Sequence, residues 1–178
     1  ARGGAEARRG DAGGLAAPGV AAWNGNSWSG LGTGLGAVVS SLRVTQSGTL
    51  LANAPVSVGA PGISEWDGVA WHPATQGFVS GALEQLPNGE IVAGGLFSMP
   101  TTGGQEIRNV ARWDGAAWQP LDPPSTPWLT SAPDSVRDIA VTPDGTLYAT
   151  GWFQIVDGVP LHGIARFNGS TWSQVGGP

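Results

Sequence analysis

Short stretches of alternating apolar and polar residues recur along this chain, and a glycine-containing turn interrupts each of them. One motif, an aromatic residue followed by Asn or Asp, Gly, two variable residues and Trp, occurs four times. Its leading aromatic residues are 43, 47 and 54 positions apart: Trp23, Trp66, Trp113 and Phe167. A second motif, which ends in Leu or Ile, one variable residue and Ala, alternates with the first at residues 42–52, 83–93 and 139–149. This alternation indicates tandem structural repeats.

Both motifs predict β-hairpins, because Asn-Gly and Asp-Gly tolerate the positive φ angles of two-residue type I′ turns. The predicted turn residues of the first motif are Asn24, Gly25, Asp67, Gly68, Asp114, Gly115, Asn168 and Gly169. A two-residue turn and a four-residue loop would both place the two aromatic side chains of the motif on one face of the hairpin. The predicted core aromatic residues are therefore Trp23, Trp28, Trp66, Trp71, Trp113, Trp118, Phe167 and Trp172.

Two hairpins per repeat give four strands, the content of one β-propeller blade. The fourteen expected strands lie at residues 19–23, 27–31, 37–45, 48–54, 62–66, 69–73, 79–86, 89–95, 108–113, 116–120, 135–142, 145–153, 163–167 and 170–175. No stretch has helical periodicity. We expect an all-β fold of tandem four-stranded antiparallel blades over residues 19–178, about three and a half blades of an open or partial propeller. Residues 1–18, rich in Gly, Ala and Arg, are expected to form a flexible arm.

The repeat resembles a known family. Residues 110–115 (Val-Ala-Arg-Trp-Asp-Gly) and 164–169 (Ile-Ala-Arg-Phe-Asn-Gly) resemble the kelch-like propeller repeats of fungal cortical polarity-marker proteins and of bacterial surface or secreted proteins, as do residues 94–97 and 150–153. The first repeat departs from the pattern at residues 53–56, where Asn-Ala-Pro-Val replaces the Gly-x-Phe ending. The resemblance implies an exported repeat protein without a common catalytic site.

Composition narrows the possible partners. The chain has 8 Arg, no Lys and 13 acidic residues, so its net charge of −5 argues against a nucleic-acid-binding surface. The absence of cysteine excludes disulfides and thiolate metal sites. No apolar stretch approaches the ~18 residues of a transmembrane helix. Because the first residue is Ala1, we expect that a leader has been removed or that this is part of a longer protein.

Candidate catalytic and metal-binding residues are few. Asp67, Asp114 and Asp144 each stand alone beside a glycine, whereas a calcium loop needs several oxygen ligands in one short segment, so we interpret them as turn residues. His72 and His162 lack a third ligand that would make a metal site, and we expect both to be exposed. No Gly-x-Ser-x-Gly segment is present. The sequence therefore predicts no catalytic residue, no cofactor and no metal ion.

The variable loops and the ends of the array are the predicted contact surfaces. Residues 98–105 and 122–133 lengthen the second and third repeats, and the partner-binding residues that we expect in them are Met99, Thr101, Pro123, Pro124 and Trp128. The open blade edges favour a protein partner or self-association. We expect a non-catalytic binding or assembly module, an extracytoplasmic (periplasmic, cell-surface or secreted) subunit that docks on a larger, membrane-bound complex. The alternative is a fragment of a propeller enzyme of the galactose-oxidase or glycosidase type, which would need tyrosine or paired carboxylates near the axis.

Overall fold

The computed structural model describes residues 11–12, 15–16, 19–54, 62–75, 81–101, 104, 106–121, 135–156 and 159–176. These residues form strands, turns and irregular segments, and none of them lies in a helix. The all-β fold class predicted from the repeats is therefore confirmed.

Three sheets of four antiparallel strands form the body of the molecule, and we call them the first, second and third blade. The strands of the first blade are β5 (Leu42–Val44), β6 (Leu50–Asn53), β7 (Ile63–Trp66) and β8 (Trp71–Pro73). Those of the second are β9 (Gly81–Gln85), β10 (Ile91–Pro100), β11 (Glu106–Trp113) and β12 (Trp118–Pro120). Those of the third are β13 (Ser135–Val141), β14 (Leu147–Trp152), β17 (Ile164–Phe167) and β18 (Trp172–Gln174).

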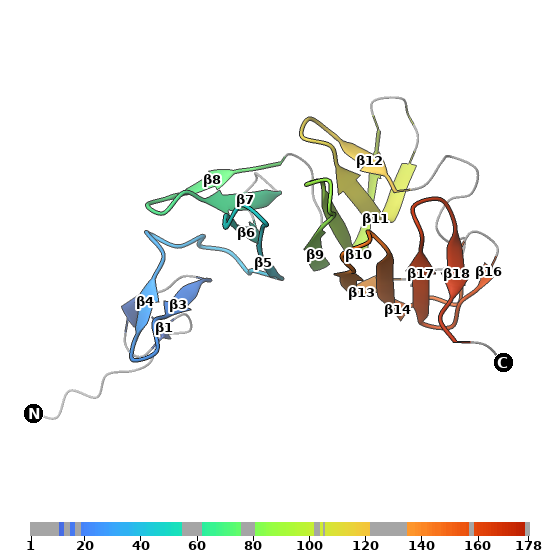
Figure 1. The fold of residues 1–178 in the computed structure, drawn as a ribbon. Helices are drawn as coiled ribbons and strands as arrows, with labels where there is room; N and C mark the ends of the chain where they lie inside the picture. The colour runs from blue at the N-terminus through green and yellow to red at the C-terminus, as the bar shows by residue number, and fades with distance from the viewer. Residues whose placement is uncertain are drawn as a thin grey trace, which may run out of the picture.

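Each blade is a meander in which an inner hairpin, built from the second motif, precedes an outer hairpin, built from the first. The inner hairpin is β5–β6, β9–β10 or β13–β14, and its second strand pairs with the first strand of the outer hairpin. The blades follow one another along an arc, with β5, β9 and β13 near its centre (Figure 1). β9 contacts both β5 and β13, so the innermost strands are neighbours, as in a propeller.

A single outer hairpin precedes the three blades. Its strands β3 (Ala21–Trp23) and β4 (Trp28–Gly30) form a two-stranded sheet of their own, which we call the half-blade. The sequence did not predict two further hairpins. β1 (Asp11–Ala12) pairs with β2 (Leu15–Ala16) inside the segment expected to be an arm, and β15 (Ile155–Val156) pairs with β16 (Val159–Pro160) between β14 and β17.

The hydrophobic core lies between the sheets and not inside any one of them. Val92 and Val110 of the second blade pack with Ile139 and Leu147 of the third. Because successive residues of a strand point to opposite faces, a blade between two neighbours buries apolar side chains on both faces. Leu51 and Leu50 show this: Leu51 packs toward the second blade, and Leu50 packs toward the half-blade.

The outer turns have the four-residue loop, one of the two lengths that the first motif allowed. Trp66 pairs with Trp71 in the strand register, so four residues separate the paired aromatic residues, and the other three copies have the same length. Within this loop the N–H of Asp67 donates to the carbonyl of Ala70 at 3.2 Å. An Asp or Asn side chain closes each loop: Oδ1 of Asp67 accepts the backbone N–H groups of Val69 and Ala70, each at 2.7 Å. Only the glycine that follows has positive φ, +99° at Gly68, whereas a type I′ turn needs two such residues. The loop is therefore closed by hydrogen bonds from backbone N–H groups to the Asp or Asn side chain, as in an Asx-turn, and not by a type I′ turn.

The inner turns also differ from the two-residue expectation. In the first blade the N–H of Thr45 donates to the carbonyl of Thr49 at 2.8 Å, which leaves a three-residue loop. The equivalent bonds join Leu86 to Glu90 and Thr142 to Thr146, both at 2.9 Å. Three-residue loops of this kind combine a type I turn with a residue of positive φ, the role of the motif glycine.

Candidate functional site

Each outer hairpin carries an aromatic pair that faces the preceding blade. The ring centroids are 5.4 Å apart in Trp66–Trp71, 5.5 Å in Trp113–Trp118 and 5.0 Å in Phe167–Trp172. Phe167 and Trp172 belong to the core between the second and third blades, and Trp118 to the core between the first and second. The pair is thus a structural contact wherever another sheet lies in front of it, including the half-blade in front of Trp66 and Trp71.

The half-blade carries the same pair without a blade in front of it. The rings of Trp23 and Trp28 are also 5.5 Å apart, but the two residues are 52% and 47% exposed, against 4% for Trp172. The prediction that Trp23 and Trp28 are core residues is therefore wrong, because a hairpin buries its outer face only when another sheet covers it. We call this exposed aromatic surface the N-terminal face.

No further blade covers the opposite side of the third blade in the part of the chain that the structure describes. The strand register aligns Ile63, Val110 and Ile164 of the three blades; the first two are 1% and 3% exposed, but Ile164 is 37% exposed. Trp152 is also exposed, and the guanidinium of Arg137 lies 4.6 Å from the centre of its ring. We call this surface, with Arg137, Trp152 and Ile164, the C-terminal face.

The sequence analysis did not identify Ile164 and Trp152, although aligning the repeats with one another would have found Ile164. Its position is apolar in every repeat, which indicates burial against a following blade, and no blade follows the third one among the described residues. Position in the array, which no local motif encodes, separates Ile164 from its buried copies. The position of Trp152 is exposed in the second blade as well, where the aligned Leu96 is 63% exposed.

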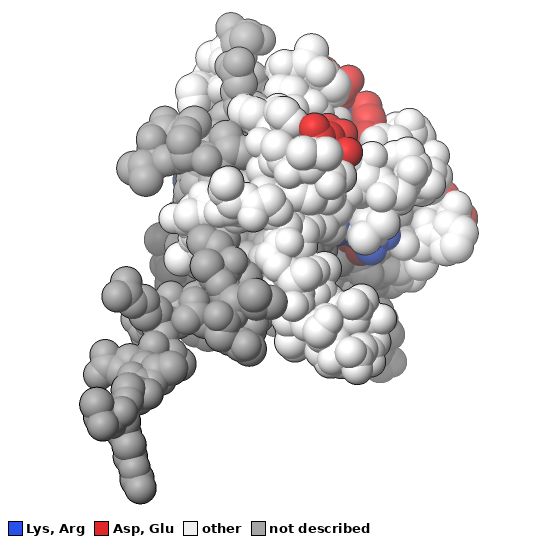
Figure 2. Space-filling view, turned by 90° about the vertical axis from the view of Figure 1, so that its left-hand side faces the viewer, with Lys and Arg blue, Asp and Glu red and all other residues white. Residues whose placement is uncertain are grey.

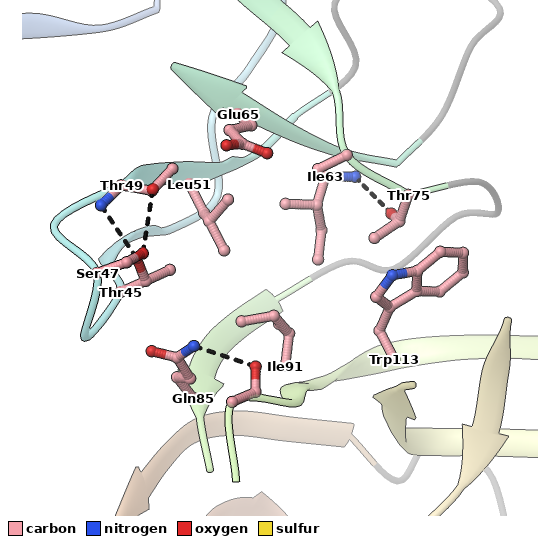
Figure 3. A pocket seen from close by; sticks show the side chains of 12 residues that line it. Thr45, Ser47, Thr49, Leu51, Ile63, Glu65, Thr75, Gln85, Ile91 and Trp113 are labelled. Atoms are coloured by element: carbon pink, nitrogen blue, oxygen red, sulfur yellow. Dashed lines mark hydrogen bonds between the residues drawn. The ribbon is translucent and has the colours of Figure 1, made fainter. Parts of the chain in front are cut away.

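A cleft of about 240 Å³ lies between the first and second blades. Figure 3 shows Leu51, Ile63 and Glu65 of the first blade on one wall and Gln85, Ile91 and Trp113 of the second blade on the other. Gln85 accepts the backbone N–H of Gln46 at 2.7 Å, so its amide joins the two blades. The lining has a carboxylate, Glu65, on one wall and an indole ring, Trp113, on the other.

Glu65 distinguishes this cleft from the interface between the next two blades. The aligned residue of the second blade is Arg112, whose Nη1 lies 2.8 Å from a carboxylate oxygen of Glu90. Glu65 is exposed, and its carboxylate has no hydrogen bond or ion pair with another described residue. Nearer the axis, Arg43 and Glu84 form an ion pair across the same blade interface, at 2.8 Å.

Hydrogen bonds in the turns lower the pKa of several exposed carboxyl groups. The backbone N–H groups of Ala70 and Val69, together with the His72 side chain, lower the pKa of Asp67 from 3.8 to about 2. Asp114 has a lowered pKa mainly because it accepts the N–H groups of Ala117 and Ala116. His72 is exposed, and its Nε2 lies 2.8 Å from Oδ2 of Asp67. These acids act as acceptors inside their own turns.

The predicted partner-binding residues lie only partly within the described chain. The loop at residues 98–105 is the tip of the long hairpin β10–β11, where Pro100 pairs with Glu106. Met99 is half-buried against the core between the first and second blades, and the carbonyl of Thr101 accepts the N–H of Gly104 at 3.0 Å. Pro123, Pro124 and Trp128 lie outside the described residues.

Among the described residues, no three His, Asp or Glu side chains gather closely enough to hold a metal ion. The same part of the chain contains no helix with the length and apolarity of a membrane span. Comparison of the chain with protein-family models, with curated proteins and with solved structures gave no match. The two exposed blade faces and the cleft between the first and second blades are therefore the candidate binding surfaces of the described chain.

Proposed function

We propose that this chain is a non-catalytic binding or assembly module that associates with a partner protein, or with itself, through the two ends of its blade array. The observation that carries the proposal is the contrast between equivalent residues. The aromatic pair is buried at Phe167–Trp172 and exposed at Trp23–Trp28. Exposed clusters of large apolar side chains are typical of protein interaction surfaces.

The C-terminal face supports the same proposal from the other end of the array. Ile164 and Trp152 present apolar surface beside the cation of Arg137, a composition enriched at protein interfaces. Closed propellers have about four to eight blades, and closure removes exposed sheet faces. Three blades and a half-blade leave two such faces, which association would cover.

The kelch-like identity of the repeat and an extracytoplasmic location belong to the same proposal. Both rest on the resemblance of the Trp-Asp-Gly hairpins to exported repeat proteins. The loops at residues 98–105 and 122–133, with Trp128 in the second, would add contacts with the partner. Fractionation of expressing cells, with the chain located by an antibody, tests the location.

Light scattering of the purified chain over a range of concentrations tests the association. We expect a molar mass above the 18.0 kDa of one chain that rises with concentration. Trp28→Asp and Trp152→Asp should lower it, because each places a charge in an apolar face. Val69→Asp, at a residue 79% exposed in an outer turn, is the matched control and should leave the mass unchanged. A chain that stays monomeric and unfolds cooperatively at every concentration would contradict the proposal.

A further inference from the structure

No inner hairpin pairs with the half-blade among the described strands. In each complete blade the first strand of the outer hairpin pairs on both edges: β7 with β6 and β8, β11 with β10 and β12, and β17 with β14 and β18. In the half-blade β3 pairs with β4 and with no other described strand. The edge of β3 that would bond an inner hairpin is therefore open.

The strand register identifies which backbone groups are open. The N–H of Asn24 donates to the carbonyl of Ser27 across the hairpin, at 3.3 Å. Because the hydrogen-bonding groups of a strand alternate between its two edges, those of Ala22 point toward β4. The groups of Ala21 and Trp23 then point to the open edge, where an added strand would bond.

A second, independent observation lies on the neighbouring blade. Leu42 and Val44 of β5 are 48% and 60% exposed, although Leu83 and Ile139, which align with Leu42, are 5% and 4% exposed. Leu83 packs in one core with Leu51, a residue of the preceding inner hairpin. Leu42 and Val44 therefore lack the cover that a preceding inner hairpin provides. We call the open edge of β3 together with these two side chains the inner gap.

The surroundings of the inner gap indicate the charge of its occupant. Residues 19–42, which contain the half-blade and the segment leading to β5, include no charged side chain. Figure 2 shows that the described surface on this side of the molecule is almost free of Lys, Arg, Asp and Glu. An uncharged edge next to exposed leucine and valine favours an apolar occupant over a charged one.

Resting on the proposed function, we propose that the inner gap receives an antiparallel β-hairpin of the inner type from another polypeptide, which completes the half-blade by β-augmentation. The three inner hairpins of this chain specify its pattern. The residue opposite Trp23 is Leu or Ile, as in Leu50, Ile91 and Leu147. The next residue is apolar and covers Leu42, and the residue opposite Ala21 is Ala, as in Ala52, Ala93 and Ala149.

The hairpins that the structure describes in this chain do not supply the missing element. The three inner hairpins are each bonded to the outer hairpin of their own blade. β1 and β2 pair with each other and contact β4, the strand on the opposite side of β3 from the open edge. The donor is therefore a hairpin other than these.

A peptide with the sequence of residues 81–95, the inner hairpin of the second blade, serves as the probe, and it carries Glu84→Gln and Glu90→Gln so that it matches the uncharged surroundings of the inner gap. Gly81 and Gly95 lie opposite each other in the register, so cysteines added at the two ends close the hairpin by a disulfide and reduce its ordering cost. Titration of the full chain by calorimetry should show saturable binding of one peptide per chain. A peptide carrying Ala93→Glu should not bind, because Ala93 occupies a fully buried position.

Two protein variants locate the binding at the inner gap. Leu42→Glu should weaken peptide binding about tenfold or more, since it places a charge where the hairpin packs, while Val69→Glu should leave binding unchanged. Ala21→Pro removes an open-edge donor and should abolish binding, whereas Ala21→Ser, the residue that blade one has at Ser64, should retain it. Circular dichroism checks that each variant keeps its strand content.

Absence of saturable binding by the closed peptide, or equal binding by the parent chain and folded Leu42→Glu, would overturn the inference. Such a result would leave the proposed function intact if light scattering still showed association sensitive to Trp152→Asp. A monomeric chain that nevertheless binds the peptide would overturn the end-to-end association and keep the hairpin site. Peptide titration therefore tests the hairpin site, and light scattering independently tests the end-to-end association.

Discussion

At the scale of single residues, the Asn or Asp of the first motif closes the turn in every copy, whereas the flanking aromatic residues are buried in some copies and exposed in others. Oδ1 of Asn168 accepts the N–H groups of Ser170 and Thr171 at 3.0 and 2.9 Å, and Oδ1 of Asp114 makes the equivalent bonds at 2.9 Å. Asn and Asp are thus interchangeable as acceptors here, and they differ only in charge. This difference makes the acidic copies responsive to pH.

The first prediction concerns acid stability. The pKa of Asp67 falls from 3.8 to about 2 on folding, and the pKa of Asp114 is also lowered. A carboxyl group with a depressed folded-state pKa contributes stability above its unfolded pKa and loses that contribution as the pH falls through the folded pKa. Urea midpoints of the parent chain should therefore decrease between about pH 4 and pH 2. In Asp67→Asn/Asp114→Asn, where the acceptor remains and the titration is gone, the decrease should be smaller.

The control for this prediction is stability at pH 7, where the double variant should unfold at nearly the urea concentration of the parent because Asn24 and Asn168 already close equivalent turns. Identical slopes for the two proteins between pH 4 and pH 2 would show that the turn acids do not drive acid unfolding.

The second prediction compares two copies of one residue. Trp172 is 4% exposed and Trp28 is 47% exposed, although both end the same motif. Trp172→Ala should destabilise the chain by about 3–5 kcal/mol, as other large-to-small core substitutions do. Trp28→Ala should cost less than about 2 kcal/mol, because roughly half of its side chain already contacts water. Chemical denaturation measures both, and equal losses would mean that the N-terminal face is covered.

At the scale of elements, the spacing of neighbouring blades depends on small residues at their contact. A Cβ placed on Gly94 of β10 would lie 2.6 Å from Val136 Cγ1 and 2.6 Å from Ile139 Cδ1 of the third blade. Both contacted residues are nearly fully buried, so they have little room to move. The strand register aligns Gly94 with Asn53 in the first blade and with Thr150 in the third. The glycine therefore permits the close contact between the second and third blades.

The third prediction tests this contact with matched substitutions. Gly94→Val should destabilise the chain, because overpacking costs about 1–3 kcal/mol and exceeds the gain of about 0.5–1 kcal/mol from removing a strand glycine. Thr150→Val, which places the same new residue at the aligned but exposed position, should change stability by less than about 0.5 kcal/mol. Thermal denaturation of the two variants is the measurement. A neutral Gly94→Val would show that the second and third blades separate without cost.

At the scale of the whole molecule, the array behaves as a row of units that each depend on their neighbours. The second blade is covered on both faces, by cores shared with the first and third blades. The half-blade shares one core, built from Val20, Leu31 and residues of the first blade, and its other face is exposed. In repeat proteins stability is approximately a sum of units and interfaces, so the ends open first.

The fourth prediction is a gradient of hydrogen exchange along the array. Backbone amides of β3 and β4 should exchange with deuterium fastest, and those of β10 and β14 should exchange slowest, because they lie in the interior of complete sheets. Mass spectrometry of peptic peptides resolves these strands. Addition of the closed 81–95 peptide should slow exchange in β3. Uniform exchange across all strands would indicate that the half-blade and the blades unfold as one unit.

The sequence by itself determined the local structure of this protein. Asp-Gly and Asn-Gly turns between apolar strands specified hairpins, and their alternation specified four-stranded blades, because both signals act within about ten residues of chain. The fourteen expected ranges correspond to the strands of the three blades and the half-blade. The outer hairpins adopt the four-residue loop and not the type I′ turn, and the motif alone left both open, since the choice between an Asx-closed loop and a type I′ turn depends on side-chain hydrogen bonds that strand periodicity does not reveal.

The tertiary structure alone decided which copies of a repeated residue are core and which are surface. Trp28 and Trp172 have the same local sequence context, and only the presence of a sheet in front of the second one buries it. The exposure of Leu42 and Ile164 follows in the same way from the absence of a covering sheet among the described residues. Whether a side chain is buried depends on the neighbouring sheet that packs against it, and the local sequence of a repeat does not specify its position in the array.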